Sequence, residues 1–378
     1  MKSYKIYVIG TRGIPNVQGG VETHCEEIYP FLQCRNFDIT LFARKRFIPK
    51  SKRTRLWKGI RIKYFWAPRN RYFESFVHTL LCIIYTIFNK PDLVHIHNIG
   101  PGFFVPCLNL FKIKSVVTHH SKNYEHEKWN YPARVFLRIC EKISIRKAGR
   151  VITVSETHQS ELYEKFKRSI VLIPNGIKIP ERKFKTDILL KHNLENHNYI
   201  LFVGRITPEK GINILFQAFL ELLSLNEGNN YSDWKLVIVG KADNLEEYNK
   251  YLREIAGQSE NIIFTGYLNK EYVHDLYESA KLFILPSYNE GCSLSLLEAL
   301  SHKIPCLVSD IPENKSFGKY KVRFFKVGNS EDLKIKFQEI LPRLLKPGTK
   351  EDFIHSEEIL DWYAVSELIE KEYMELLK

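Results

Sequence analysis

Residues 4–33 read YKIYVIGTRGIPNVQGGVETHCEEIYPFLQ and predict a strand, a glycine-rich loop and a helix in immediate succession. Residues 5–9 are an apolar run typical of a short buried strand, and residues 21–33 have the apolar spacing of an amphipathic helix. Because this strand begins so near the first residue, we expect no secretory signal peptide.

The same alternation of strands and helices continues along the chain. The first half has further predicted strands at 38–42, 60–65, 93–96, 115–118, 150–154 and 170–173, and further helices at 75–88, 102–110, 132–147 and 157–165. A polar segment from the turn at residues 174–176 to residue 198 interrupts the pattern. The second half has predicted strands at 199–203, 235–239, 262–265, 282–285, 306–308 and 323–325, and helices at 208–225, 245–257, 270–279, 295–301, 331–345 and 361–377.

This alternation predicts an α/β protein with two doubly wound parallel sheets. The expected domains are residues 1–180 and 181–360, with a last helix in residues 361–378 that packs back on the first domain. Tandem domains of this kind are expected to bind a ligand in a cleft between the carboxyl ends of their sheets.

Charge is unevenly distributed along the 378 residues, whose net charge is +13. Residues 1–185 contain 34 Lys and Arg against 13 Asp and Glu. Residues 39–73 contain twelve basic residues, no acidic residue and several aromatic ones. Such a segment attracts phosphates on nucleic acid or on anionic lipid, although a solvated loop face is the simpler alternative.

Cysteine usage indicates the compartment. The seven cysteines are an odd number and include no CxxC pair, so a disulfide framework or a zinc knuckle is not expected. A reducing cytosol fits this pattern. The longest uncharged stretch, residues 75–89, is too short to span a bilayer and predicts a buried or interfacial helix.

Two glycine loops follow predicted strands. The loop of residues 10–20 ends in Gly19 and Gly20, and glycines let backbone N–H groups approach an anion at a helix start. The loop of residues 204–211 contains Thr207 as an expected N-cap, so that Lys210 would lie in the first helical turn with Arg205 just outside. Two cations there can hold a diphosphate, whereas an ordinary capped helix is the alternative.

A third junction, residues 286–299, contains two glutamates. Glu290 precedes the predicted helix, where a carboxylate can accept hydrogen bonds from sugar hydroxyls. Glu298 lies further along and can do the same for a ribose diol. The alternative role of Glu298 is structural, because Ser295 and Glu298 have the spacing of a capping box.

Together these motifs resemble a known family over essentially the whole chain. Glu290 and Glu298 are separated by seven residues, Arg205 and Lys210 by four, and the paired glycines lie near the N-terminus. The chain thereby resembles the retaining GT-B glycosyltransferases of family 4, the glycosyl transferases group 1. The resemblance implies two Rossmann-like domains that face a central cleft.

The resemblance also implies roles for individual residues. Glu290 would contact the transferred sugar, Glu298 would bind the nucleotide ribose, and Arg205 with Lys210 would hold the diphosphate. Gly19 and Gly20 would let the N-terminal loop close over it. The remaining donor-side residues would be Gly291, Ser293, Leu294, Ser295 and Leu296, with backbone amides completing the phosphate cradle.

A histidine pair after the strand at 115–118 resembles the active-site histidine of this family. We align His120 with it, so that the predicted catalytic residues are His120, Glu290, Arg205 and Lys210. His119 stays open as the alternative, because Ser121 stands where the family more often has glycine. A structural histidine that bonds the backbone is a competing interpretation for either residue.

Other residues of the first domain are assigned to the acceptor side. These are His97, His119, Glu125 and Trp129, with His126 and Glu127 in the same loop. His95 and His97 alternate along a strand and are expected to face opposite sides of the sheet, which argues against joint metal binding. No Asp-x-Asp motif occurs, so no metal ion and no other cofactor are expected.

The predicted function is a hexosyl transfer from a nucleotide sugar, with UDP-sugar favoured and dTDP-rhamnose or a GDP-sugar as alternatives. The basic first domain indicates a saccharide acceptor, polyprenyl-diphosphate-linked, in the synthesis of bacterial lipopolysaccharide or capsule. We expect a cytoplasmic enzyme, peripheral at the inner, anionic face of the cell membrane. The non-transferase alternatives are a sugar-nucleotide epimerase and a nucleic-acid-binding protein. No nucleic acid partner is expected, because nucleic-acid binding leaves the paired glutamates and cations unexplained.

Overall fold

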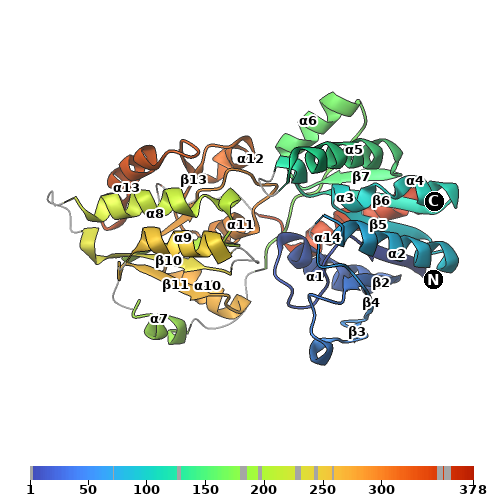
Figure 1. The fold of residues 1–378 in the computed structure, drawn as a ribbon, viewed down its shortest axis with the longest axis horizontal. Coiled ribbons are helices and arrows are strands. Elements are labelled where there is room, and N and C mark those ends of the chain that lie inside the picture. Colours follow the sequence, from blue (N-terminus) through green and yellow to red (C-terminus); the bar gives the residue numbers. More distant parts are fainter. Residues whose placement is uncertain are drawn as a thin grey trace. The chain divides into compact units, whose positions relative to one another are not determined.

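The computed structural model describes residues 3–70, 72–125, 129–178, 185–194, 198–225, 231–241, 246–257, 259–346, 352 and 359–378. The chain divides into two compact units, Met1–Gly176 with Leu360–Lys378, and Ile177–Ile359. Each unit is built on one sheet with helices on both faces, so the predicted α/β class with two doubly wound sheets is confirmed (Figure 1).

The first unit contains an eight-stranded sheet in the order β3-β4-β2-β1-β5-β6-β7-β8. Its neighbours pair in parallel, except that the short β3 pairs antiparallel with β4 and was not predicted. The strands are β1 (Tyr4–Ile9), β2 (Phe37–Arg44), β3 (Leu56–Trp57), β4 (Ile60–Phe65), β5 (Leu93–His97), β6 (Lys114–His119), β7 (Arg150–Thr153) and β8 (Val171–Leu172).

Helices cover both faces of this sheet. The larger layer buries apolar residues of α2, α4, α5 and α6 against alternate residues of the strands, and α1 with α14 covers the opposite face. The helices are α1 (Gly20–Gln33), α2 (Glu74–Asn89), α3 (Ile99–Gly102), α4 (Val105–Leu110), α5 (Tyr131–Lys147), α6 (Glu156–Phe166) and α14 (Trp362–Leu377), with 3₁₀ turns η1 (Lys50–Lys52) and η2 (Asn123–Glu125).

The last helix of the chain completes the first unit. α14 lies beside α1 although more than 300 residues separate them in sequence (Figure 1). Asp361 caps its start by accepting a hydrogen bond from the Ala364 amide, and Arg35 of α1 contacts Glu370 at 2.7 Å. Tyr373 is fully buried. A segment remote in sequence therefore supplies part of the core of the first unit.

The second unit contains a six-stranded parallel sheet in the order β11-β10-β9-β12-β13-β14. Successive residues of β9 alternate between two apolar cores, with Ile200 and Phe202 in one and Tyr199 and Leu201 in the other. Both faces are thus buried, as parallel sheets require. The strands are β9 (Asn198–Val203), β10 (Trp234–Val239), β11 (Ile262–Gly266), β12 (Leu282–Leu285), β13 (Cys306–Ser309) and β14 (Arg323–Phe325).

The helices of this unit are short and begin mostly where a strand ends. They are α7 (Asp187–Lys191), α8 (Ile212–Leu223), α9 (Glu246–Ala256), α10 (Lys270–Ser279), α11 (Leu294–Ser301), α12 (Pro312–Lys315) and α13 (Ser330–Leu344), with 3₁₀ turns η3 (Pro208–Lys210), η4 (Tyr231–Asp233) and η5 (Gly318–Tyr320). Throughout the described residues, none of the helices combines the length and apolarity that crossing a bilayer requires.

Two predicted helices are wrong in the same way. The helix expected at 102–110 is divided into α3 and α4, and the one expected at 208–225 is divided into η3 and α8. The second break occurs at Gly211, which adopts the left-handed conformation with φ +65°. Because glycine reaches this region without a steric penalty, the 3₁₀ turn can end there and α8 begins at the next residue.

Candidate active site

The loops that follow β9 and β12 meet at the carboxyl edge of the second sheet. A side chain at Gly211 would place its Cβ 2.2 Å from the carbonyl oxygen of Pro286, so only glycine permits this approach. The Tyr288 amide donates a hydrogen bond to the Glu209 carbonyl at 2.9 Å. Two segments about 80 residues apart are thereby held against each other.

This contact brings two predicted site residues together. Lys210 Nζ lies 2.5 Å from Glu290 Oε1, and their side chains are only 15% and 9% exposed. The Ser287 hydroxyl donates to the same carboxylate oxygen at 2.6 Å. Since a partly buried ion pair with a further hydrogen bond has a defined geometry, the ammonium group and the carboxylate form a preorganised pair.

Ser287 is a site residue that the sequence did not reveal. It is fully buried, and the Ser309 hydroxyl donates to its carbonyl at 2.5 Å, while Asn314 donates to Ser309. The supporting residues come from β13 and α12, so no local motif marks them. The signal available was the serine in the strand-to-helix loop three residues before Glu290.

Arg205 and Thr207 line the loop before Lys210. The guanidinium group of Arg205 forms no hydrogen bond or ion pair with any other described residue. Thr207 precedes η3 as expected, but its side chain makes no capping hydrogen bond, so its prediction as an N-cap is wrong in that respect. Its buried hydroxyl has no partner in the described part of the chain. Within the described residues, the loop thus holds a cation and a buried hydroxyl that have no partner.

Lys210 also lies elsewhere than predicted. It is the last residue of η3, and α8 begins only at Ile212, so Lys210 is outside the first turn of that helix. The expectation that Lys210 lies in the first turn of this helix is therefore wrong, because Lys210 belongs to the 3₁₀ turn that precedes it. The left-handed Gly211 separates the 3₁₀ turn from the helix and aims the lysine toward the loop that carries Glu290.

The capping-box interpretation of α11 is wrong as well. The N-cap of this helix is Ser293, whose side chain accepts a hydrogen bond from the Leu296 amide at 3.4 Å. Ser295 therefore lies inside the helix, where it cannot form a capping box with Glu298. Instead the carboxylate of Glu298 lies 3.2 Å from the hydroxyl of Tyr277, and burial raises the pKa of that phenol well above its usual value.

The N-terminal glycine loop of the first unit encloses a carboxylate of its own chain. Gly19 precedes α1 with φ +148°, and a Cβ there would collide with Glu22 Oε2 at 2.0 Å. Glu22 accepts hydrogen bonds from the Arg12 amide at 2.8 Å and from the Thr11 hydroxyl at 3.2 Å. Gly20 is the first residue of α1. Gly19 is therefore favoured here by its positive φ and its close approach to Glu22, which the sequence reasoning missed.

His119 and His120 point to opposite faces of the first sheet. His119 Nε2 lies 3.3 Å from Glu141 of α5, both side chains are fully buried, and Lys165 lies 2.5 Å from the other oxygen of Glu141. His120 lies 2.9 Å from His97 on the side of α1 and α14 and is 8% exposed. His119 therefore anchors α5 and α6, which favours His120 as the histidine of the site.

The prediction that His95 and His97 face opposite sides is wrong. Residues two positions apart in a strand share a face, because the side-chain period is two. The two rings stack with their centroids 4.3 Å apart, and both contact the hydroxyl of Tyr29. The other face of β5 carries Val94 and Ile96 in the apolar core. The geometric argument against joint metal binding consequently fails.

The remaining acceptor-side residues are dispersed. Glu125 ends η2, is exposed, and lies 3.9 Å from Lys122. Trp129 contacts the ring of Tyr72 with centroids 5.6 Å apart. His126 and Glu127 lie outside the described residues.

Three of the twelve cations of the basic segment form ion pairs within the described part of the first unit. Arg44 and Arg46 both form ion pairs with Glu74, and Arg61 pairs with Asp38. Other cations in this segment remain around an open hollow of about 460 Å³. The residues that line it are Lys45, Arg46, Arg53, Trp66, Ala67, Pro68 and Arg69. Lys50, Lys52, Arg55 and Lys58 of the same segment are also exposed, so the segment presents positive charge beyond this hollow as well.

Two family models match the chain in succession. Residues 18–179 match the model described as Glycosyltransferase Family 4, and residues 185–348 match the one described as Glycosyl transferases group 1. The chain belongs to the group 1, family 4 glycosyltransferases. This membership confirms the resemblance on which the predicted roles rest.

Named relatives and solved structures agree with this membership. An uncharacterised glycosyltransferase of Methanocaldococcus jannaschii is 30% identical over 181 residues, 45% of each chain. The O-antigen chain mannosyltransferase B of Escherichia coli is 27% identical over 224 residues, 56% of each chain. The chain thus spans about half the length of these relatives.

Sucrose-phosphate synthase from Thermosynechococcus elongatus superposes with a TM-score of 0.80 at 20% identity over 99% of both chains. HepE from Anabaena, solved in complex with UDP, superposes with a TM-score of 0.76 at 16% identity over the full length of both. At these identities the likeness shows the fold, and the fold is GT-B.

Proposed function

We propose that this glycosyltransferase moves a hexosyl residue from a nucleotide sugar, a UDP-sugar by preference, to a saccharide acceptor with retention of configuration. The observation that carries the proposal is the Lys210–Glu290 pair at 2.5 Å, beside an unpaired Arg205 in the described chain. The pair joins a cation suited to a diphosphate with a carboxylate suited to sugar hydroxyls. A relative crystallised with UDP supports the choice of nucleotide.

The proposed role of Lys210 and Arg205 is to stabilise negative charge on the leaving diphosphate. As the glycosidic bond breaks, negative charge grows on the departing diphosphate, and cations fixed nearby stabilise the transition state more than the ground state. Lys210 is held in place by Glu290, which is itself held by the Ser287 hydroxyl, so little reorganisation is needed. The buried Thr207 hydroxyl would gain the partner that it lacks among the described residues. No metal ion at the diphosphate is required by this arrangement.

Glu298 and His120 have supporting roles in this proposal. The carboxylate of Glu298 accepts a hydrogen bond from Tyr277. Since a carboxylate has several acceptor sites, it can also accept hydrogen bonds from the ribose hydroxyls. Burial lowers the pKa of His120 well below the usual value of a histidine, so the ring is neutral near pH 7. A neutral imidazole can form hydrogen bonds with sugar hydroxyls but cannot stabilise charge as a cation would.

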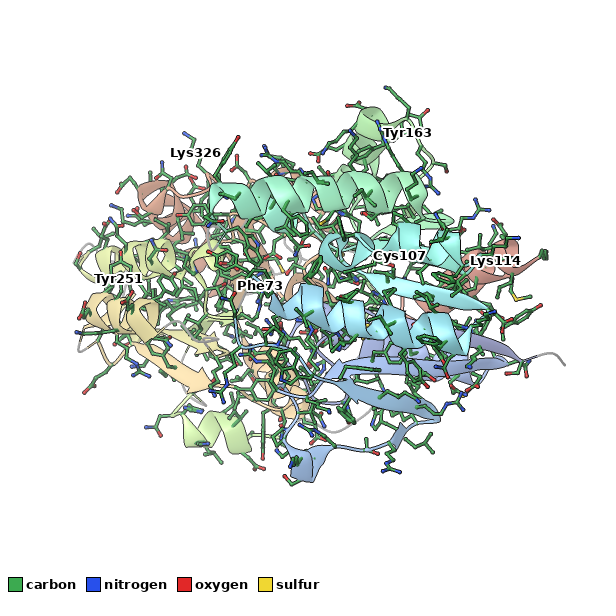
Figure 2. All side chains as sticks on the ribbon, turned by 45° about the vertical axis from the view of Figure 1, so that its right-hand side comes forward. Phe73, Cys107, Lys114, Tyr163, Tyr251 and Lys326 are labelled. Carbon is green, nitrogen blue, oxygen red and sulfur yellow. The ribbon has the colours of Figure 1, made fainter. Side chains whose placement is uncertain are left out.

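The acceptor is proposed to be a lipid-linked saccharide at an anionic bilayer surface. Helices α2, α4 and α5 lie side by side on one face of the first unit, with Phe76 of α2 packed against Phe104 and Phe136 (Figure 2). Their outward apolar residues are Leu80, Ile84, Phe88, Leu110, Val135, Phe136 and Ile139. Exposed cations on and beside these helices are Lys90, Lys112, Arg138, Lys142, Arg146 and Lys147.

The exposed charge on this face is positive. The two acidic residues within the three helices, Glu74 and Glu141, are both in ion pairs and largely buried. Exposed apolar side chains between cations bind at the boundary of an anionic bilayer, because each kind of group finds its preferred surroundings there. Assembly of a bacterial surface polysaccharide would place its acceptor at such a surface, and a relative acts on an O-antigen chain.

Product analysis tests the proposed reaction. The full-length chain is incubated with UDP-, GDP-, dTDP- and ADP-sugars, first alone and then with a polyprenyl-diphosphate-linked saccharide. We expect sugar to appear on the acceptor only when both are present, and a UDP-sugar to raise the melting temperature by binding the native state. Conversion of the donor without any acceptor would indicate an epimerase instead.

Co-sedimentation with vesicles tests the membrane surface. We expect stronger binding to anionic than to neutral phosphatidylcholine vesicles, and weaker binding by Phe88→Glu, since Phe88 is 83% exposed. Tyr251→Glu is the matched control, because Tyr251 is an exposed aromatic residue of α9 in the second unit. Equal binding to both vesicles would remove this part of the proposal, and tighter binding to duplex DNA than to vesicles would favour the nucleic-acid alternative.

A further inference from the structure

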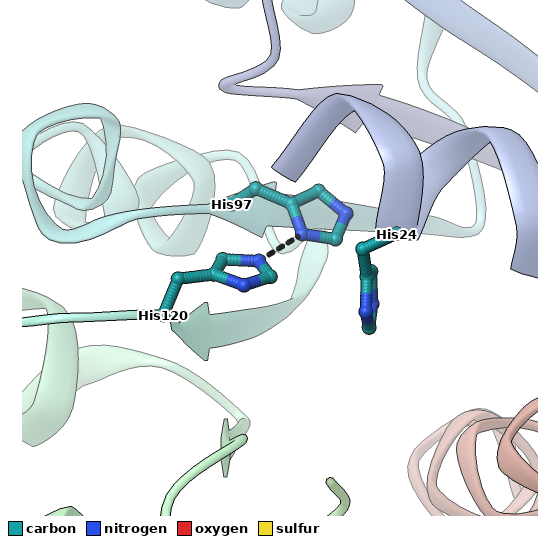
Figure 3. A group of neighbouring side chains, drawn as sticks. All are labelled: His24, His97 and His120. Atoms are coloured by element: carbon teal, nitrogen blue, oxygen red, sulfur yellow. Dashed lines mark hydrogen bonds between the residues drawn. The ribbon is translucent and has the colours of Figure 1, made fainter. Parts of the chain in front are cut away.

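Three histidines converge at the carboxyl edge of the first sheet. His24 lies on α1, His97 ends β5, and His120 directly follows β6 (Figure 3). One ring nitrogen of each lies within 4.8 Å of those of the other two, and they form the one such group in the described chain. The family roles assigned above use only His97 and His120 and leave the convergence unexplained.

No group among the described residues donates a hydrogen bond to Nε2 of His24. His24 Nδ1 lies 2.9 Å from Asn175 Oδ1, and because a carbonyl oxygen only accepts, Nδ1 carries the hydrogen. Nε2 therefore carries the lone pair. Its side chain is 1% exposed, and Nε2 has no hydrogen-bond partner among the described residues. A buried acceptor without a partner destabilises the fold unless another group supplies one.

The other two rings can supply lone pairs to the same point. His97 Nδ1 and His120 Nε2 are 2.9 Å apart and share a single hydrogen. His97 Nε2 lies 2.7 Å from the hydroxyl of Tyr29, so the hydrogen of His97 can move to Nε2 and be donated there. With the hydrogen of His120 on Nδ1, both nitrogens of the contact present lone pairs. Two nitrogens on one tetrahedral zinc ion lie about 3.3 Å apart, so the two rings would separate by a few tenths of an ångström to hold an ion between them.

The ring nitrogens that would not bind the ion have hydrogen-bonding partners of the kind found around metal sites. Histidines that bind metals usually donate their second ring N–H to an oxygen, which fixes the tautomer and the ring orientation. Asn175 does this for His24 and Tyr29 can do it for His97. Tyr29 in turn is held by His95 at 3.0 Å, and His95 by Tyr373 of α14 at 2.6 Å.

The three imidazole rings are in the charge state that can bind a cation. Burial lowers the pKa of His24 to about 4 and lowers the pKa of His97 and His120 well below the usual value. All three imidazoles are therefore neutral at pH 7, which is the form that binds metals. A group of three neutral imidazoles prefers borderline transition-metal ions over Mg²⁺ or Ca²⁺, which favour oxygen ligands.

We propose that His24, His97 and His120 bind a divalent transition-metal ion of the zinc class through His24 Nε2, His97 Nδ1 and His120 Nε2. The fourth coordination position is left to water or a ligand. The ion would fix the ring of His120 and hold α1 against the ends of β5 and β6. This site does not involve Lys210 or Arg205, but it shares His120 with the proposed function. Because the ion would take Nε2, the N–H at Nδ1 of His120 stays available to a sugar hydroxyl.

Cobalt titration of the full-length chain tests the site. Co²⁺ bound by three imidazoles and one further ligand absorbs visible light far more strongly than octahedral aqueous Co²⁺. We expect wild-type protein to develop this absorption, Zn²⁺ to displace the cobalt, and His24→Gln to lose the signal. His24 is chosen because it has no role in the proposed transfer.

His274→Gln is the matched control. His274 Nδ1 and His302 Nε2 form a comparable imidazole contact of 2.8 Å in the second unit, without a third ligand of suitable geometry among the described residues. We expect His274→Gln to retain the absorption. A second variant, Asn175→Ala, keeps all three ligands and should weaken Co²⁺ binding by about ten- to a hundredfold.

Circular dichroism and melting of each variant establish that it is folded. Wild-type absorption no stronger than that of a folded His24→Gln, or loss of the signal in His274→Gln, would overturn the proposal. If His24→Gln fails to fold, the Co²⁺ affinity of Asn175→Ala is the deciding measurement. An affinity equal to that of wild type would contradict the proposal that Asn175 orients His24 as a metal ligand.

Discussion

The carboxyl edges of the two sheets have opposite chemistry although both sheets are parallel and doubly wound. The edge in the first unit is filled with neutral imidazoles and phenols that bond one another, as in His97, Tyr29 and His95. The edge in the second unit carries formal charges, namely Lys210 paired with Glu290, and Arg205 without an ionic partner in the described chain.

Burial explains this difference. The histidines of the first edge are almost completely inaccessible, and burial lowers their pKa so that the charged form is excluded. Lys210 and Glu290 keep some exposure and neutralise each other at 2.5 Å. Sheets of similar topology can therefore carry a network of neutral groups at one edge and charged groups at the other. Substitutions at the two edges should accordingly differ in their effects on turnover and on stability.

The largest expected effect is on turnover, at the charged edge. Lys210→Ala should reduce kcat by about 10²- to 10³-fold, the range measured when a fixed transition-state donor is removed. Lys250→Ala is the control, because Lys250 is 81% exposed in a long contact with Glu254. Steady-state kinetics and melting temperatures measure both. Turnover of Lys210→Ala near that of wild type would refute the proposed role of this lysine.

The second largest effect is expected on stability, at the contact between the loops of Gly211 and Pro286. Gly211→Ala adds a left-handed alanine, which costs about 1–2 kcal/mol, and a Cβ 2.2 Å from the Pro286 carbonyl, which forces the two loops apart. Gly257→Ala has nearly the same φ, +58°, but its nearest described atom is 3.9 Å away. Urea unfolding should therefore show a larger loss for Gly211→Ala. Equal losses would mean that the close approach contributes nothing.

The third prediction concerns the neutral groups of the first unit. Burial lowers the pKa of His78 from 6.5 to about 3, so below pH 6.5 the unfolded chain binds a proton that the native state does not. Its contribution to stability is complete above pH 6.5 and is lost as the pH falls toward 3, by at most about 1.4 kcal/mol per pH unit. His78→Gln should flatten the pH dependence of the unfolding free energy in this window. An unchanged slope would contradict the buried neutral state.

The smallest expected effect is on stability, when either of two helix caps in the second unit is replaced. Ser293 caps α11 and Asn329 caps α13, each through its side chain. Replacement of either by alanine should cost about 1 kcal/mol of stability. Only Ser293→Ala should also raise the KM for the nucleotide sugar, because only α11 follows the loop of Glu290. A KM change in Asn329→Ala as large as that in Ser293→Ala would show that the effect is unspecific.

Much of the architecture could be predicted because it depends on short-range patterns. Strand β9 and helix α10 were predicted within one residue, since apolar runs of period two and amphipathic runs of period 3.6 are local properties. Errors arose where a single residue decided the outcome. Gly211 divides one predicted helix near its start, and Ser293 rather than Ser295 caps α11.

Site residues divide in the same way. Arg205, Lys210, Glu290 and Glu298 could be chosen from spacing at strand-to-helix junctions, because junctions of parallel strands lie at one edge of the sheet. Their partners Ser287 and Tyr277 could not, since they are held in place by β13 and α10, which are distant in sequence. His24 was missed for the same reason, because a histidine inside an amphipathic helix has no local mark.

The sequence by itself determined the α/β alternation, the two units and the glycosyltransferase family, because each depends on residue types at fixed spacing along the chain. Only the tertiary structure decided which of these residues meet. It brought Lys210 to Glu290 across about 80 residues and Tyr373 to His95 across almost 280, since such contacts arise from packing of whole elements and not from local preference.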